Sequence, residues 1–124
     1  MLHRTYYNFS GTVKQKLSGG TVSCRDFAAL FMVAARCLGF AARCVSGYLH
    51  APPSTDSLGA THAWTEVYLP GAGWKGFDPT IGKIAGTDHF AVAVARLPES
   101  VPPIAGSFVG PSSLDVGVWI TMWE

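Results

Sequence analysis

The chain of 124 residues is predicted to have an α+β fold, with one helix packed on an antiparallel β-sheet in a single domain. Clear helical periodicity begins at residue 23 and ends at residue 39. The segments that follow alternate apolar and polar residues or are β-prone, and Gly- and Pro-rich turns separate them. No linker or repeat divides the chain, and a composition of 48% hydrophobic and 14% charged residues excludes a disordered protein.

The helix is predicted to begin after Ser23 and to run for about four turns. Ser23 is a typical N-cap residue, and Asp26 three positions later completes a capping-box pattern. Gly39 is a typical C-terminal stop. One broad apolar face is expected to be buried, formed by Phe27, Leu30, Phe31, Ala34, Ala35 and Leu38.

The rest of the chain is predicted to form a meander of strands. The expected strands cover residues 42–50, 62–69, 74–78, 90–96 and 114–122, with loops at 52–60 and 97–111. Pro70 to Gly73 is the turn between the second and third strands. Alternation in the second strand predicts one face formed by His62, Trp64, Glu66 and Tyr68 and another by Ala63, Thr65, Val67 and Leu69.

Charge and cysteine content exclude several classes of protein. Nine Lys or Arg against eight Asp or Glu give a net charge of +1 without a basic run, so nucleic-acid binding is not expected. No apolar stretch reaches the length of a membrane span. Three cysteines are too few for a secreted disulfide scaffold, which predicts a cytoplasmic protein. The low charge content predicts apolar surface that meets a partner, either a further domain or a second copy of the chain.

Cys24 is the strongest candidate for a nucleophile, because it occupies the first position of the predicted helix. A helix N-terminus carries a partial positive charge that stabilises a thiolate, and Arg25 adds a cation beside it. The backbone N–H of Cys24 would also be the first donor to an oxyanion. Cysteine is often merely a buried apolar residue, and this is the interpretation for Cys37 and Cys44.

A thiolate nucleophile needs a base, and His62 is the best placed of four histidines. His3 lies in the weakly patterned start of the chain, and His50 and His89 lie at strand borders without a clear partner. If the strands on either side of Pro70 to Gly73 pair, His62 and Asp78 reach the same end of the hairpin, where the carboxylate can orient the imidazole. Asp78 before Pro79 is alternatively a simple turn residue.

Glu66 is a weaker candidate for orienting His62, because it shares the predicted face but lies four residues along the strand.

These motifs resemble the transglutaminase-like superfamily, in particular its bacterial members. The resemblance rests on GTVSCRDF around Cys24, THAWTEV around His62 and GWKGFDPT around Asp78, in this order and at familiar spacing. The segments LGFAAR and VSGY between them, and DHF with residues 102–110 after them, also resemble the family. The likeness covers about residues 19–124.

The resemblance implies a papain-like cysteine proteinase fold. It assigns Cys24 as nucleophile, His62 as general base and then acid, and Asp78 as the residue that orients His62. The implied reaction is acyl transfer on amide or peptide bonds of a protein or peptide through a thioester, with hydrolysis expected and transamidation of protein glutamine as the alternative. No cofactor and no metal are implied. Trp64 or Trp74 is hypothesised to shield the His–Asp pair from water.

Two departures from the family pattern bear on these expectations. Arg25 stands where relatives often have Gln, which affects local contacts with substrate. Related bacterial proteins usually carry a β-rich region before the cysteine motif, so residues 1–124 are expected to be a catalytic core from a longer protein. Two alternative functions are a non-catalytic interaction module and a metal site formed by Cys24, His62 and Asp78.

Overall fold

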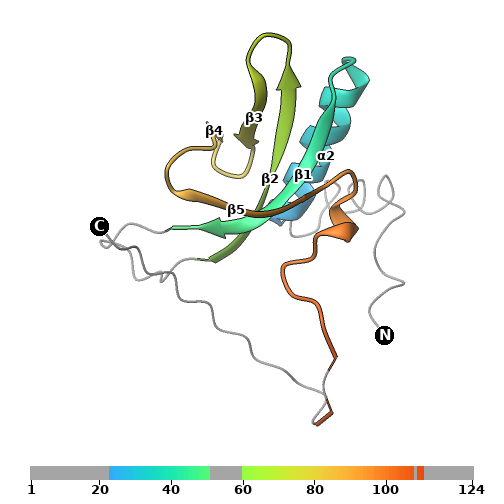
Figure 1. The fold of residues 1–124 in the computed structure, drawn as a ribbon, viewed down its shortest axis with the longest axis vertical. Helices are drawn as coiled ribbons and strands as arrows, with labels where there is room; N and C mark the ends of the chain where they lie inside the picture. The colour runs from blue at the N-terminus through green and yellow to red at the C-terminus, as the bar shows by residue number, and fades with distance from the viewer. Residues whose placement is uncertain (1–22, 51–59, 108, 111–124) are drawn as a thin grey trace.

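The computed structural model describes residues 23–50, 60–107 and 109–110, and it has one helix packed on a five-stranded antiparallel sheet (Figure 1). The elements are α2 (Cys24–Cys37), β1 (Ala42–Leu49), β2 (Ala60–Leu69), β3 (Gly73–Asp78), β4 (Lys83–Ile84), β5 (His89–Ala95) and the short 3-10 helix η2 (Pro98–Ser100). The α+β prediction is confirmed. The predicted strand 114–122 and most of the predicted loop 52–60 lie outside the described residues, as does His3. None of the described helices is long and apolar enough to cross a membrane.

The ends of helix α2 are set by local capping. The Ser23 side chain accepts a hydrogen bond from the Asp26 N–H, and the Ser23 N–H donates to Asp26 Oδ2 at 2.9 Å, which completes the predicted capping box. At the other end Gly39 has φ +91°, a left-handed conformation that favours glycine. Both predicted ends of the helix are therefore confirmed.

The predicted buried face of the helix is only partly correct, because Ala35 is buried and Phe31 packs against the core while the other predicted residues are not buried. The residues that face the sheet are Ala28, Ala29, Met32 and Ala35, whereas Leu38 is 78% exposed. The small alanines let the helix backbone approach β2 closely enough for the Thr65 hydroxyl to donate to the Ala28 carbonyl. Phe31 lies at the edge of this contact and stacks on Phe77 at 5.5 Å between ring centroids.

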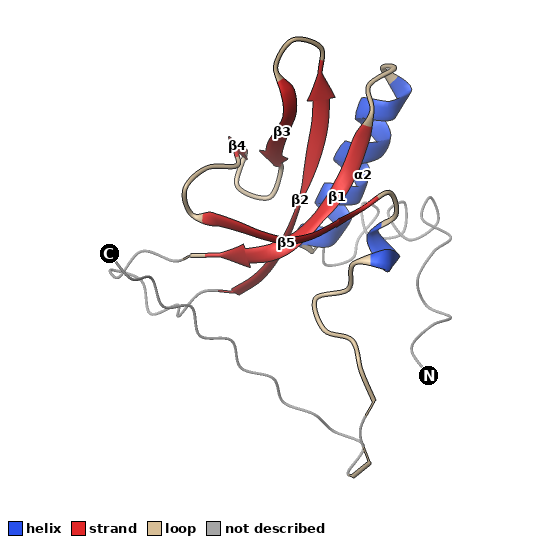
Figure 2. Ribbon diagram, in the orientation of Figure 1, coloured by secondary structure: helices blue, strands red, loops and turns tan. Residues whose placement is uncertain are grey.

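The sheet is not a plain meander. Its strand order is β4-β3-β2-β1-β5, so the chain returns after β4 to place β5 along the free edge of β1 (Figure 2). Leu49 pairs with His89 at one end of this contact and Cys44 with Ala95 at the other, with an irregularity between Ser46 and Gly47. Strand β4 was not predicted.

Strand β2 is covered on both faces where it approaches the end of the sheet. His62, Ala63, Trp64 and Thr65 are all buried, so both of the alternating faces predicted for this strand are covered in this part of it. Helix α2 covers the Thr65 side, and the ring of His89 packs edge-on against Trp64 at 5.0 Å between centroids. The described core is thus continuous with the surroundings of His62.

Candidate active site

Cys24 occupies the first turn of α2, where the backbone N–H groups have no partner within the helix. Burial of this half-buried thiol raises its pKa. The hydrogen bonds that it makes with His62 and with the backbone of Ala63, together with the charges of His62 and Arg25, outweigh burial and bring the pKa below its ordinary value of 9.0. The environment of Cys24 therefore favours the thiolate more than that of a free cysteine does.

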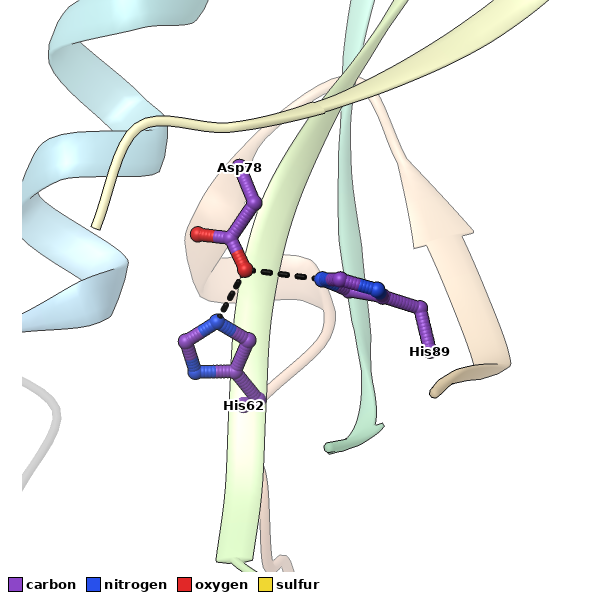
Figure 3. Close-up of side chains that lie close together, drawn as sticks. All are labelled: His62, Asp78 and His89. Carbon is purple, nitrogen blue, oxygen red and sulfur yellow. Dashed lines mark hydrogen bonds and ion pairs between the residues drawn. The ribbon is translucent and has the colours of Figure 1, made fainter. Parts of the chain in front are cut away.

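His62 connects Cys24 to Asp78. Its Nε2 lies 2.6 Å from Asp78 Oδ2, with side chains 8% and 0% exposed, so Nδ1 is the ring nitrogen that remains for the thiol (Figure 3). Burial lowers the pKa of His62, but hydrogen bonds to Cys24 and Asp78 and their charges raise it above 6.5 overall. The protonated ring is thus stabilised between a thiolate and a carboxylate.

Asp78 ends β3 with both carboxylate oxygens occupied. Oδ1 accepts the Thr80 N–H at 3.1 Å, as in a turn, and Oδ2 faces His62 and also His89, whose Nε2 lies at 2.8 Å. Burial raises the pKa of Asp78, but these hydrogen bonds and the charge of His62 lower it below 3.8 overall. The turn contact with Thr80 and the contact with His62 therefore involve different oxygens of one carboxylate.

His89 was missed from the sequence, and the expectation that it lacks a partner is wrong. It begins β5, and the return of this strand to β1 brings its ring to Asp78 (Figure 3). No local pattern indicates this pairing, because residues 79–88 that intervene carry no helical or strand periodicity. His50 also has a neighbour, since its Nδ1 lies 3.7 Å from Oδ1 of the exposed Asp88.

Of three further candidate residues, Glu66 and Trp74 lie away from the His62–Asp78 pair and Trp64 lies beside it. Glu66 forms an ion pair with Arg43 at 2.7 Å and does not orient His62. Trp74 is exposed, and its ring lies under the guanidinium of Arg43 at 4.0 Å. Trp64 is buried and packs beside His62 and His89, so it is the one of the two tryptophans that lies at the candidate site.

The guanidinium of Arg25 is hydrogen-bonded to other residues of the protein. It donates to the Pro98 carbonyl at 3.0 Å and to Ser46 Oγ at 3.3 Å, which fastens the start of α2 to β1 and η2. Arg25 therefore acts on Cys24 through its charge and by fixing the helix end. The expectation that residue 25 affects contacts with substrate has no support in these contacts.

The remaining cysteines differ from each other. Cys37 is exposed, so its prediction as a packing residue is wrong. Cys44 is buried in the core as predicted, and burial raises its pKa to about 11. All three cysteines are free thiols.

Potential metal ligands also gather here, although not in the predicted combination. His62, Asp78 and His89 offer ligand atoms within 4.8 Å of one another, with His89 in the place expected for Cys24. The two imidazole Nε2 atoms are already hydrogen-bonded to Asp78, so each has a partner without a metal. This arrangement suits proton positioning, and a metal would have to replace both hydrogen bonds.

Comparison with known proteins identifies one family. The model of the transglutaminase-like superfamily matches residues 2–79, which include Cys24, His62 and Asp78. An uncharacterized protein of Mycobacterium leprae is 34% identical over 101 residues, covering 77% of this chain and 35% of that protein. Uncharacterized proteins of Mycobacterium bovis and Mycobacterium tuberculosis are each 35% identical over 113 residues, covering 82% of this chain and 36% of those proteins. The chain thus spans about a third of the length of these relatives, and no solved structure matches it.

Proposed function

The chain belongs to the transglutaminase-like superfamily, and on this basis we propose that it catalyses acyl transfer at amide bonds of a protein or peptide. Cys24 is the nucleophile, His62 the base and acid, and Asp78 the residue that orients His62. The observation that carries the proposal is the continuous contact from the Cys24 thiol through the His62 ring to the buried Asp78 carboxylate. The nearest sequence-level alternative is a domain of the same family without activity.

The first half of the reaction would form a thioester. The Cys24 thiolate attacks the amide carbonyl carbon, a C–S bond forms, and the carbonyl oxygen takes the negative charge. The backbone N–H of Cys24 at the start of α2 is placed to stabilise this oxyanion. His62 then gives its proton to the amide nitrogen, the C–N bond breaks and the amine leaves.

The second half would release the acyl group by hydrolysis. His62, now neutral, takes a proton from a water molecule as the water oxygen attacks the thioester carbon. The C–S bond breaks, a carboxylic acid is released, and the thiolate and imidazolium are restored. Transamidation follows the same course with an amine in place of water. Hydrolysis is the preferred outcome because water is abundant, whereas transamidation would need a site that selects an amine over water.

Two features support the proposal: the electrostatics of the Cys24–His62 pair and the free state of the thiols. The pKa of Cys24 is lowered and that of His62 is raised, and this pair of directions favours a thiolate–imidazolium pair near neutral pH. A nucleophilic thiol must remain reduced, and the three free thiols support a cytoplasmic location.

Selective alkylation tests the proposed nucleophile. The native protein is treated with limiting iodoacetamide between pH 5 and pH 9, and the three cysteines are separated by peptide mapping. We predict that Cys24 reacts faster than Cys37 at pH 6, because its lowered pKa raises the fraction of thiolate present at this pH. Cys37 is an exposed thiol of the same chain, and Cys44 is buried, so both serve as internal references.

His62→Ala should remove the preference for Cys24, whereas His50→Ala should preserve it because His50 contacts Asp88 and not the thiol. Equal rates for Cys24 and Cys37 in the native protein at pH 6 would contradict an activated thiolate. Selective alkylation without turnover of peptide amides would favour the domain without activity. Incorporation of a labelled amine into a glutamine-containing peptide, at a rate above hydrolysis, would instead establish transamidation.

A further inference from the structure

We propose that His89 is a second positioning residue of this site, which donates its Nε2–H to Asp78 and holds the carboxylate ionised and aimed at His62. The inference rests on the proposed function and adds a residue from β5, outside the segment 2–79 matched by the family model. Three observations carry it: the hydrogen-bond pattern of the His89 ring, the shared oxygen of Asp78, and the packing that fixes the ring.

The hydrogen bonds of His89 determine which of its nitrogens carries the proton. The backbone N–H of Gly86 donates to His89 Nδ1 at 3.1 Å, so Nδ1 is an acceptor and has no hydrogen. A neutral imidazole with an unprotonated Nδ1 has its hydrogen on Nε2. Nε2 lies 2.8 Å from Asp78 Oδ2, so His89 is a neutral donor to this carboxylate (Figure 3).

Asp78 Oδ2 lies within hydrogen-bond distance of both histidine rings. The Nε2 atoms of His62 and His89 lie 2.6 Å and 2.8 Å from this oxygen, and all three side chains are at most 8% exposed. A buried carboxylate that loses a donor becomes easier to protonate or to rotate, because water does not replace the missing hydrogen bond. Burial opposes ionisation of Asp78, and the hydrogen bond from His89 is the largest influence that lowers its pKa.

Packing fixes the His89 ring in this orientation. Its edge lies against the buried Trp64, and its strand is held in register by the pairing of His89 with Leu49. The titratable side chains near Asp78 are His62 on β2, His89 on β5 and, beyond His62, Cys24 on α2. Lys83 pairs with Asp78 along the backbone of β4, and its side chain is exposed.

Two substitutions separate the donor from the bulk of the side chain. His89→Leu removes the N–H, whereas His89→Gln keeps an N–H donor at a similar distance from the backbone. We expect His89→Leu to slow alkylation of Cys24 at pH 6 about tenfold and to move the acid side of the pH profile to higher pH. This direction follows because a protonated or misaligned Asp78 no longer stabilises the imidazolium that stabilises the thiolate. His89→Gln should stay within about threefold of the native rate and keep the native profile, and His50→Leu is the matched control.

Nuclear magnetic resonance tests the same contact without relying on activity. In the native protein the ring nitrogens of His89 should report a neutral tautomer with the hydrogen on Nε2. The carboxyl carbon of Asp78 should titrate at higher pH in His89→Leu than in the native protein. A hydrogen on Nδ1 of His89, an unchanged Asp78 titration, or an unchanged or faster alkylation rate in His89→Leu would each overturn the inference.

The two proposals fail in different ways. If native Cys24 shows no preferential alkylation, the proposed function is contradicted, and the tautomer of His89 and the titration of Asp78 still decide the role of His89 at the carboxylate. If His89→Leu does not fold, the tautomer in the native protein and the pH profile of His89→Gln remain decisive. Both proposals would be supported if the alkylation rate of Cys24 in His89→Leu rises at higher pH than in the native protein and reaches the native rate at high pH.

Discussion

The side chain of Asp78 takes part both in the turn after β3 and in the candidate site. Asp78 Oδ1 accepts the Thr80 N–H, Oδ2 lies within hydrogen-bond distance of two histidine rings, and the side chain is fully buried. The strand end, the turn and the site are therefore coupled through one side chain. A substitution at Asp78 should be visible in stability as well as in reactivity.

The pH dependence of stability follows from the two pKa directions at this pair. The pKa of His62 is raised in the folded protein, so its contribution to stability is complete below about pH 6.5 and is lost as the pH rises through the folded value. The pKa of Asp78 is lowered, so its contribution is present above about pH 3.8 and is lost as the pH falls through the folded value.

We therefore predict that Asp78→Asn lowers the free energy of unfolding by about 1–3 kcal/mol at pH 5 and by less at pH 9. Part of the loss persists at pH 9, because His89 and Thr80 also donate to the carboxylate. Urea unfolding followed by tryptophan fluorescence at the two pH values measures the difference. Asp88→Asn is the control, since Asp88 is 60% exposed and its loss should have little effect at either pH. A larger loss at pH 9 than at pH 5 would show that the sign is wrong.

At the scale of elements, the features set by local interactions were predictable. The helix begins at the capping box that Ser23 and Asp26 form three residues apart, and it ends at the left-handed backbone conformation of Gly39. Both signals are local and can be recognised in the sequence. The hairpin of β2 and β3 follows from the turn at residues 70–73, and it brings His62 to Asp78. This is why Cys24, His62 and Asp78 could be named together before the fold was known.

Features set by distant contacts were not predictable in the same way. Apolar periodicity predicted that the larger side chains of the helix are buried. The buried residues are instead mostly alanines, because the helix packs closely on β2, and this depends on the surface of the partner strand. The pairing of β5 with β1 joins residues forty or more positions apart and has no local sequence signal. His89 was missed for this reason, because its partner is defined only after β5 returns.

Gly47 tests the contact between β1 and β5. A Cβ at this position would overlap the carbonyl oxygen of Phe90 and press on the ring of Trp64, and a backbone oxygen of a paired strand cannot move aside alone. We predict that Gly47→Ala lowers the free energy of unfolding by about 2–3 kcal/mol, in the range of overpacked buried sites. Because β5 carries His89, the same variant should slow alkylation of Cys24 at pH 6.

Gly86→Ala is the matched control, since a Cβ there would meet nothing within 4 Å and Gly86 is exposed. It should keep the Gly86 N–H that donates to His89 and should leave Cys24 reactivity near the native level. Urea unfolding and peptide mapping measure both variants in parallel. Native stability in Gly47→Ala would mean that β5 does not lie against β1 as described.

For the whole molecule, the candidate site lies where the helix end meets strands that are distant in sequence (Figure 1). Cys24 comes from α2, His62 from β2, Asp78 from β3 and His89 from β5. Arg25 and the hydroxyl of Thr65 fasten the helix to the sheet near this point. The site therefore requires the assembled sheet, and no single element contains enough of it to act alone.

The low charge content corresponds to exposed apolar side chains in the described residues. Leu38, Ile84 and Val92 are each more than two-thirds exposed; Leu38 follows the end of α2, Ile84 lies on β4 and Val92 on β5. The prediction that a further domain or a second copy covers apolar surface stays a prediction. The match covers only 35% and 36% of the length of these relatives, so whether a further domain covers this apolar surface is a question for the full-length proteins.

The assembly of the site from four elements predicts how it is lost in denaturant. In rising urea at pH 6, the excess reactivity of Cys24 over Cys37 should disappear at the same midpoint at which buried Cys44 becomes accessible to iodoacetamide. The reason is that Cys44 lies in the core between α2 and the sheet, and the contacts that activate Cys24 cross the same interface. Peptide mapping of all three cysteines at each urea concentration measures both events in one sample. Loss of Cys24 selectivity well before exposure of Cys44 would instead show that the helix end or β5 detaches while the core remains folded.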